Sequence, residues 1–164
     1  MKTLWLLRHA KSSWDDPSLP DHDRPLKPRG IKAARRIGQL LTQQRCLPEL
    51  VLCSTAVRAG ETLQLVLDAA RISVPVEYRE SLYHCAPAEF IAALNGVSPT
   101  ISTVMLVGHN PGLEEFLQQL TNCEEAMPTG CLAQVDIARD DWSRLDENSR
   151  GMLVALWRPR DLED

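Results

Sequence analysis

Apolar segments of strand length alternate along this chain with helical segments, and that alternation restricts the fold more than any other feature. Strands that are joined by helices run parallel and need helices on both faces of the sheet. The sequence therefore predicts an α/β fold with three layers, α/β/α, around a mostly parallel central sheet. The two late strands flank "RDDWSRLDENSR" and are expected to form an antiparallel pair. The apolar segments are residues 3–7, 50–54, 74–78, 103–109, 131–138 and 151–159.

Four helices are predicted between these strands. The first begins near Pro28, a residue that suits the first helical turn, and its apolar residues recur with helical spacing. The second covers about residues 56–70, where the apolar stripe is core packing, and the third covers 87–96 and ends at a glycine. In the fourth, Asn110 can act as the N-terminal cap and Pro111 occupies the first helical position.

Composition is that of an ordinary globular chain, with 164 residues of which 44% are hydrophobic and 24% charged. We expect residues 1–164 to form a single domain. The net charge of −4 argues against non-specific binding to nucleic acid. No apolar run has the length of a membrane span, and "MKTLWLLRHAK" becomes charged too early for a signal peptide. We therefore expect a cytoplasmic protein that binds neither nucleic acid nor membrane.

The cysteines and the short motifs exclude several classes of site. The five cysteines are odd in number and include no C-x-x-C pair, which fits reduced thiols better than disulfides or a zinc site. The sequence also lacks H-E-x-x-H, G-x-x-x-x-G-K-[ST] and G-x-G-x-x-G. We therefore expect no metal and no cofactor.

Polar and charged residues follow three of the predicted strands at the point where each strand ends. Arg8 and His9 end the first strand, Ser54 and Arg58 follow the second, and residues 108–110 (Gly-His-Asn) end the fourth. Because the carboxyl ends of parallel strands meet at one edge of a sheet, these side chains are expected to lie close together. A lone Arg or His in such a place is usually structural, but three equivalent positions favour a site.

The predicted site suits an anion. Two arginines offer paired donors to phosphoryl oxygens, and the starts of two helices would direct free backbone N–H groups to the same place. We therefore expect a phosphate group as the occupant. His84, within "SLYHC", is a candidate site-lining residue, whereas His22 lies in a Pro- and Asp-rich loop and is expected to be solvated.

Four motifs in order, "LLRHAKSSW", "DRPLKPRG", "STAVRAGET" and "VGHNPG", resemble those of the histidine phosphatase superfamily, and most of all its small SixA-type phosphohistidine phosphatases. The resemblance spans nearly the whole chain. It implies a six-stranded phosphoglycerate-mutase-like fold, and it places the catalytic residues at Arg8, His9, Arg58 and His109. It also implies phosphoryl hydrolysis or transfer through a phosphohistidine, without a metal, on a phosphorylated protein or a small phosphorylated substrate.

The sequence departs from the family pattern at several positions. The glycine that usually follows Arg-His is Ala10, so this backbone position must avoid positive φ. Lys27 stands where a threonine often caps the first helix, and lysine cannot accept the capping hydrogen bond. Glu80 is the carboxyl group nearest to the acid of many relatives and is a candidate general acid, or else an ordinary surface residue. Arg24 and Lys11 are expected to add positive potential at the mouth of the site, or are simply solvated.

The implied mechanism begins with a neutral imidazole. His9 can attack phosphorus directly, provided that a hydrogen bond to its other ring nitrogen sets the tautomer. Arg8, Arg58 and a protonated His109 would hold the phosphoryl oxygens, and water would then cleave the phosphohistidine. The chain lacks long insertions, so we expect an open pocket. An open pocket admits a protein side chain, and a leaving imidazole depends less on a well-placed acid than a leaving alkoxide does. Both points favour phosphohistidine on a protein over an alkyl phosphate as the substrate.

Three alternatives stay open. "CSTAVR" resembles the loop of a cysteine phosphatase, but four residues instead of five separate Cys53 from Arg58. A sugar-phosphate or other small-ester phosphatase would use the same four residues as a phosphohistidine phosphatase. A non-catalytic phosphate-binding module could also have this fold. The sequence does not determine the oligomeric state, and a monomer is the favoured expectation.

Overall fold

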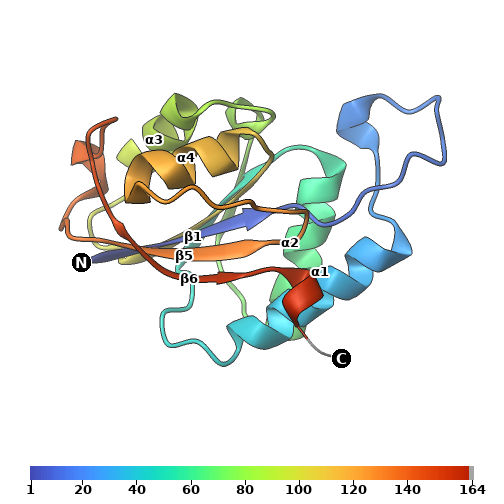
Figure 1. Cartoon of the computed structure of the whole chain (residues 1–164), viewed down its shortest axis with the longest axis horizontal. Coiled ribbons are helices and arrows are strands. Elements are labelled where there is room, and N and C mark those ends of the chain that lie inside the picture. Colours follow the sequence, from blue (N-terminus) through green and yellow to red (C-terminus); the bar gives the residue numbers. More distant parts are fainter. Residues whose placement is uncertain (163–164) are drawn as a thin grey trace.

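The predicted strands form one six-stranded sheet in the computed structural model of the chain, which describes residues 1–162 (Figure 1). The sheet order is β3-β2-β4-β1-β5-β6. The first four of these strands are parallel, whereas β5 pairs antiparallel with β1, and β6 antiparallel with β5. Both the parallel sheet and the late antiparallel pair are therefore confirmed. The strands are β1 (Lys2–Arg8), β2 (Leu50–Ser54), β3 (Val76–Arg79), β4 (Thr103–Gly108), β5 (Leu132–Ile137) and β6 (Met152–Trp157).

Helices cover both faces of the sheet, as the alternation predicted. The helices α1 (Pro28–Leu41) and α2 (Val57–Ala70) pack on one face, and α3 (Pro87–Asn95) and α4 (Gly112–Thr121) pack on the other (Figure 1). The three-layer α/β/α arrangement is therefore confirmed. Within residues 1–162, no helix combines the length and the apolar character that crossing a membrane requires.

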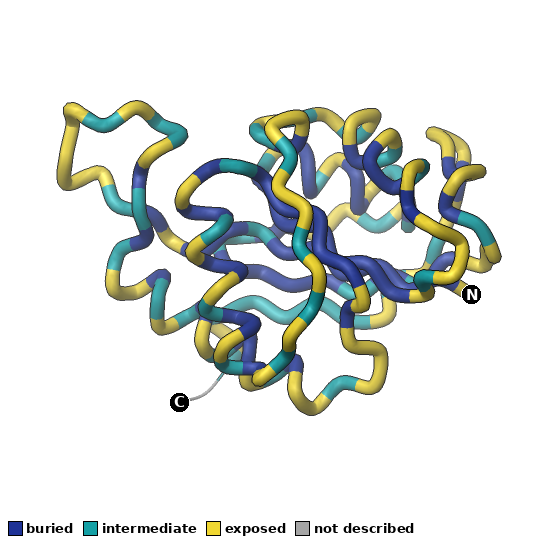
Figure 2. The backbone as a smooth tube through the Cα atoms, turned by 180° about the vertical axis from the view of Figure 1, so that it is seen from behind, coloured by how far each residue is buried: buried dark blue, intermediate teal, exposed yellow. Residues whose placement is uncertain are grey.

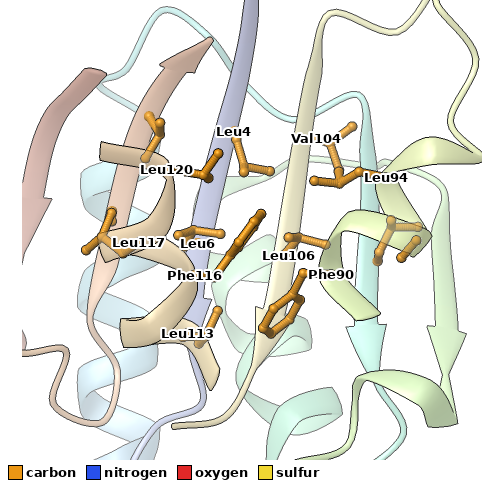
Figure 3. Close-up of a cluster of buried hydrophobic side chains, with 14 of the residues drawn as sticks. Leu4, Leu6, Phe90, Leu94, Val104, Leu106, Leu113, Phe116, Leu117 and Leu120 are labelled. Carbon is orange, nitrogen blue, oxygen red and sulfur yellow. The ribbon is translucent and has the colours of Figure 1, made fainter. Parts of the chain in front are cut away.

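Alternate residues of β1 supply the two cores, because successive side chains of a strand point to opposite faces. Leu4 and Leu6 pack with α3 and α4, where Phe90 and Phe116 stack with ring centroids 5.4 Å apart (Figure 3). The intervening Trp5 belongs to the core beneath α1 and α2. Figure 2 shows the buried residues gathered in the strands and on the inner sides of the helices, whereas exposed residues dominate the connecting loops. The central strands are thus held from both sides, and their carboxyl ends are placed rigidly.

The helix ends agree with the predictions except at α4. Pro28 opens α1 after Lys27, which makes no capping hydrogen bond through its side chain, and α3 ends just before a glycine, as expected. The fourth helix begins at Gly112, so the prediction that Pro111 is its first residue is wrong by one position. Pro111 is instead the N-cap residue, and Asn110 Oδ1 accepts the Glu114 backbone N–H at 3.3 Å.

Two glycines let helices approach the loops that carry site residues. A Cβ atom at Gly30 of α1 would overlap the backbone carbonyl oxygen of Lys11, just after β1, and one at Gly112 of α4 would overlap that of Cys85. Backbone therefore contacts backbone at both places, and no side chain lies between them. The starts of α1 and α4 fix the segments after β1 and β3 by this close contact.

We expect Gly30→Ala to destabilise the protein by about 1–3 kcal/mol, because the Lys11 backbone cannot move away as a flexible side chain would. The matched control is Gly60→Ala in α2, where the added Cβ would lie at an ordinary 3.6 Å from Tyr78. This control should raise stability by up to about 1 kcal/mol through helix propensity alone. Urea unfolding measures both. Equal effects of the two substitutions would contradict the contact at Gly30.

Candidate active site

The polar strand ends meet in one pocket of about 350 Å³. It lies at the carboxyl edge of β1, β2 and β4, as the parallel arrangement requires. Of the ten predicted site residues, Ser54 and Glu80 do not line it, and the other eight do. Those eight are Arg8, His9, Lys11, Arg24, Arg58, His84, His109 and Asn110.

His9 is held as a neutral imidazole with a defined tautomer. Its side chain is only 6% exposed, and its Nδ1 donates a hydrogen bond to the Ala10 carbonyl at 2.8 Å. Since a carbonyl can only accept, Nδ1 carries the proton and Nε2 keeps its lone pair. Burial, reinforced by the charges of Arg58 and Arg8, lowers the pKa of His9 to about 4. Ala10 has no positive φ, so alanine fits here without strain.

Arg58 is a buried cation at the centre of the pocket, with 1% of its surface exposed. Its Nη2 donates to the Asp21 carboxylate at 3.0 Å, and its Nη1 donates to the Asp21 backbone carbonyl at 2.7 Å. The Nε atoms of Arg58 and Arg8 are both buried without a hydrogen-bond acceptor among residues 1–162. Arg8, Arg24 and Arg58 all line the pocket, and such a set of guanidinium groups suits an anionic ligand.

His109 lies beside His9, with the two ring centroids 5.1 Å apart. Its Nδ1 is 3.4 Å from Arg58 Nη2, which can only donate, so Nε2 carries the proton and donates to Ser54 Oγ at 2.8 Å. Burial, together with His9 and the Arg58 charge, lowers the pKa of His109 to about 2. The prediction of a protonated His109 is therefore wrong for this pocket. Ser54 is fully buried behind His109 and orients its ring.

The sequence analysis missed Asp21, the carboxylate that organises the pocket. Besides Arg58, it accepts hydrogen bonds from Tyr83 Oη at 2.5 Å and His84 Nε2 at 3.0 Å, and Arg24 Nε lies 3.1 Å from its other oxygen. Burial opposes its ionisation, but these donors and the Arg58 charge hold its pKa well below the usual range. The only signal in the sequence was its place beside Arg24 in "DHDRPL", because nothing local indicates a contact with a residue 37 positions away.

The rim of the pocket is basic and aromatic. Arg24 is buried, donates to Ser12 Oγ at 2.9 Å and lies against the ring of Trp14, with 3.5 Å from its guanidinium carbon to the ring centroid. Trp14 itself is 73% exposed and was also missed. Lys11 is exposed and lines the pocket, as does the half-exposed His84. Arg24 and Lys11 thus both line the pocket.

Glu80 and His22 differ from what the sequence predicted, and Cys53 decides the cysteine-phosphatase alternative. Glu80 is exposed and outside the pocket, because β3 is the edge strand and two strands, β2 and β4, separate it from β1. His22 is partly buried and not simply solvated, since its Nε2 hydrogen-bonds Thr55 Oγ1 at 2.8 Å. Cys53 is fully buried, and burial raises the pKa of its thiol to about 12, which contradicts the reading as a cysteine phosphatase.

Backbone amides contribute less to the pocket than the sequence suggested. At the start of α4, the Leu113 N–H donates to the His109 carbonyl at 3.1 Å and the Glu114 N–H is capped by Asn110. Before α2, the Ala56 N–H donates to Ser54 Oγ at 3.2 Å. The prediction of free helix N–H groups is wrong at these positions, so guanidinium groups supply the donors. Among residues 1–162, no group of three or more His, Cys, Asp or Glu side chains could hold a metal ion.

Comparison with known proteins agrees with this geometry. The structure of a candidate phosphohistidine phosphatase SixA from Nakamurella multipartitia is 31% identical, with a TM-score of 0.83 and 96% of each chain covered. One from Agrobacterium tumefaciens is 28% identical, with a TM-score of 0.83 and coverage of 96% of this chain and 98% of that one. An uncharacterized chloroplastic protein of Arabidopsis thaliana is 36% identical over 155 residues, which are 86% of this chain and 69% of the relative.

The sequence profile of the histidine phosphatase superfamily (branch 1) matches residues 4–86, which include β1, α1, α2 and the 80–86 segment. This half of the chain contains Arg8, His9, Asp21 and Arg58, whereas His109 lies beyond it. On the combined evidence of sequence, fold and pocket, the chain belongs to the histidine phosphatase superfamily and resembles its SixA-type phosphohistidine phosphatases.

Proposed function

We propose that this chain is a phosphatase that removes the phosphoryl group from phosphohistidine on a protein, with His9 as the nucleophile and the whole chain acting as one catalytic domain. One observation carries the proposal: a neutral imidazole with an available Nε2 lies in the same pocket as the guanidinium groups of Arg8 and Arg58. The likeness to SixA structures at 31% and 28% identity supports it.

In the first step, His9 Nε2 forms a bond to phosphorus as the bond to the leaving nitrogen breaks and its electron pair returns to the substrate imidazole. Arg8 and Arg58 hold the oxygens of the transferring group and stabilise its charge. His109 contributes as a neutral group, aligned by Ser54 and Arg58. In the second step, water attacks the phosphohistidine, phosphate leaves, and the electron pair returns to His9.

The leaving group decides between phosphohistidine and an ester. An alkoxide needs a well-placed acid, but Glu80 lies outside the pocket and Asp21 is ionised and bound to Arg58. A substrate imidazole can take a proton before it departs, so it needs no such acid. The pocket therefore supports phosphohistidine over a sugar phosphate as the substrate.

We expect brief reaction and quenching to trap phosphate on the protein in an acid-labile, alkali-stable linkage. His9→Ala should abolish trapping, because the nucleophile is lost. The matched control is His22→Ala, a histidine outside the pocket, which should still be labelled. An alkali-labile adduct, or labelling that persists in His9→Ala, would contradict the assignment of His9.

The two buried histidines predict a pH dependence of stability. Their folded pKa values, about 4 for His9 and about 2 for His109, lie below the 6.5 of an unperturbed histidine. Between the folded and unfolded pKa values, the unfolded chain binds more protons than the folded chain. The contribution of the two histidines to the free energy of unfolding is therefore complete above about pH 6.5 and falls as the pH drops toward 4. We expect a loss of about 1–2 kcal/mol per histidine between pH 7 and pH 5 in urea unfolding.

NMR titration of the imidazole rings tests the same point directly. His9 should stay neutral at pH 5.5, with its resonances assigned by their loss in His9→Gln. The His9→Gln variant should also lose part of the pH dependence of stability. A His9 pKa near 6.5 would contradict the neutral nucleophile.

We expect kcat/KM to be at least about 10-fold higher for a phosphohistidine peptide than for a phosphoserine peptide or a sugar phosphate, since the pocket lacks a positioned acid. Glu80→Gln should leave all three activities unchanged, because Glu80 is outside the pocket. A clear advantage for a sugar phosphate would favour the small-ester phosphatase instead. An absence of turnover on every substrate would favour the non-catalytic module.

A further inference from the structure

Two further hollows continue from the active-site pocket along α1. The first, of about 230 Å³, shares Lys11 and Thr129 with the active-site pocket. The second, of about 300 Å³, shares Arg29 and Arg160 with the first. Together they form a groove that leads away from the site at Lys11. Its walls come from α1 and from the short helical turn after β6 (Pro159–Asp161), and these two elements are neighbours in Figure 1.

Among residues 1–162, every charged residue that lines this groove is a cation, although the whole chain has a net charge of −4. We call it the basic groove, and its charged residues are Lys11, Arg29, Lys32, Arg36 and Arg160. Lys32 and Arg36 have interactions of their own, so the argument rests on the other three.

The charges of these three residues are little compensated. Within the described residues 1–162, Lys11 and Arg29 form no ion pair. In the same described part of the chain, Arg160 pairs only with its neighbour Asp161, at 3.9 Å, and both side chains are more than half exposed, so water screens that pair. The groove therefore concentrates positive potential beside the site.

The groove has the dimensions of an extended protein segment. The α1 residues that line the groove extend from position 29 to position 36, which is about 10 Å along the helix. Its other wall contains Pro128, Pro159 and Arg160. A substrate segment that delivers phosphohistidine to the pocket can pass Lys11 and Thr129 and then lie beside Arg29 and Arg160.

We infer that the basic groove docks acidic side chains that flank the phosphohistidine of the protein substrate. This inference rests on the proposed function and names the partner surface, an acidic protein segment. Complementary charge speeds encounter and fixes register, and its effect declines with salt. Nucleic acid and anionic membranes suit the groove less well, because the rest of this acidic chain would repel an extended polyanion.

The test compares two peptides of equal length, each with one phosphohistidine, one flanked by glutamates and the other by serines. The variant is Arg29→Glu with Arg160→Glu, neither of which lines the active-site pocket. The matched control is Arg35→Glu with Arg45→Glu, which changes net charge equally at exposed positions outside the described pockets. Folding should be preserved, because the substituted side chains are exposed and Glu at position 29 suits the first turn of α1.

The wild-type protein should favour the glutamate peptide. The groove variant should raise KM for that peptide by roughly 10-fold with kcat unchanged, and high salt should remove most of the difference. Hydrolysis of phosphoramidate and of the serine peptide should stay within about 2-fold, and so should every activity of the control. Equal KM values for the two peptides, or an equal effect of the control variant, would overturn the inference.

Direct binding separates this inference from the proposed function. If the wild type hydrolyses neither peptide, the proposed function fails. The docking inference is then tested by fluorescence anisotropy, which measures binding of the unphosphorylated glutamate peptide. Weaker binding by the groove variant than by the control supports the groove, and equal binding overturns it. Tighter, groove-dependent binding of a single-stranded oligonucleotide or of phosphatidylserine vesicles would overturn the assignment to an acidic protein.

Discussion

The buried guanidinium of Arg58 is the constraint on which the site depends. A cation with 1% of its surface exposed is costly unless a charge and hydrogen bonds compensate it. Asp21 supplies both, through its carboxylate and its backbone carbonyl. The same carboxylate binds Tyr83 and His84, so a single residue from the loop after β1 ties α2 to the segment after β3. The fold thereby fixes the Arg58 guanidinium at the wall of the pocket.

The backbone after β1 couples the nucleophile to the same cation. The Ala10 carbonyl sets the tautomer of His9, while the Ala10 N–H donates to Thr62 Oγ1 at 2.9 Å. Thr62 in turn donates to the Arg58 carbonyl at 2.7 Å, so the His9 loop and the first turn of α2 move as one unit. A change in the position of either cation or nucleophile would therefore disturb the other.

The electrostatic properties of the pocket agree with one another. Burial and neighbouring cations keep both central histidines neutral, while Asp21 pairs with both Arg58 and Arg24 and forms no ion pair with Arg8 among the described residues. Such a pocket favours a dianionic phosphoryl group and leaves Nε2 of His9 unprotonated. The basic groove beside the pocket has the same preference for negative charge, and there it acts on the residues that flank the phosphohistidine in the substrate.

The sequence by itself determined the strand-and-helix alternation, the layers, and the meeting of Arg8, His9, Arg58 and His109, because periodicity and strand-end position are local properties. Only the tertiary structure decided which carboxyl group lies in the pocket. Asp21 meets residues 37 and 62 positions away, and the sheet order leaves Glu80 at the edge strand, outside the pocket. It also decided that His109 is neutral, since that depends on burial and on Arg58, and neither can be read from neighbours in sequence.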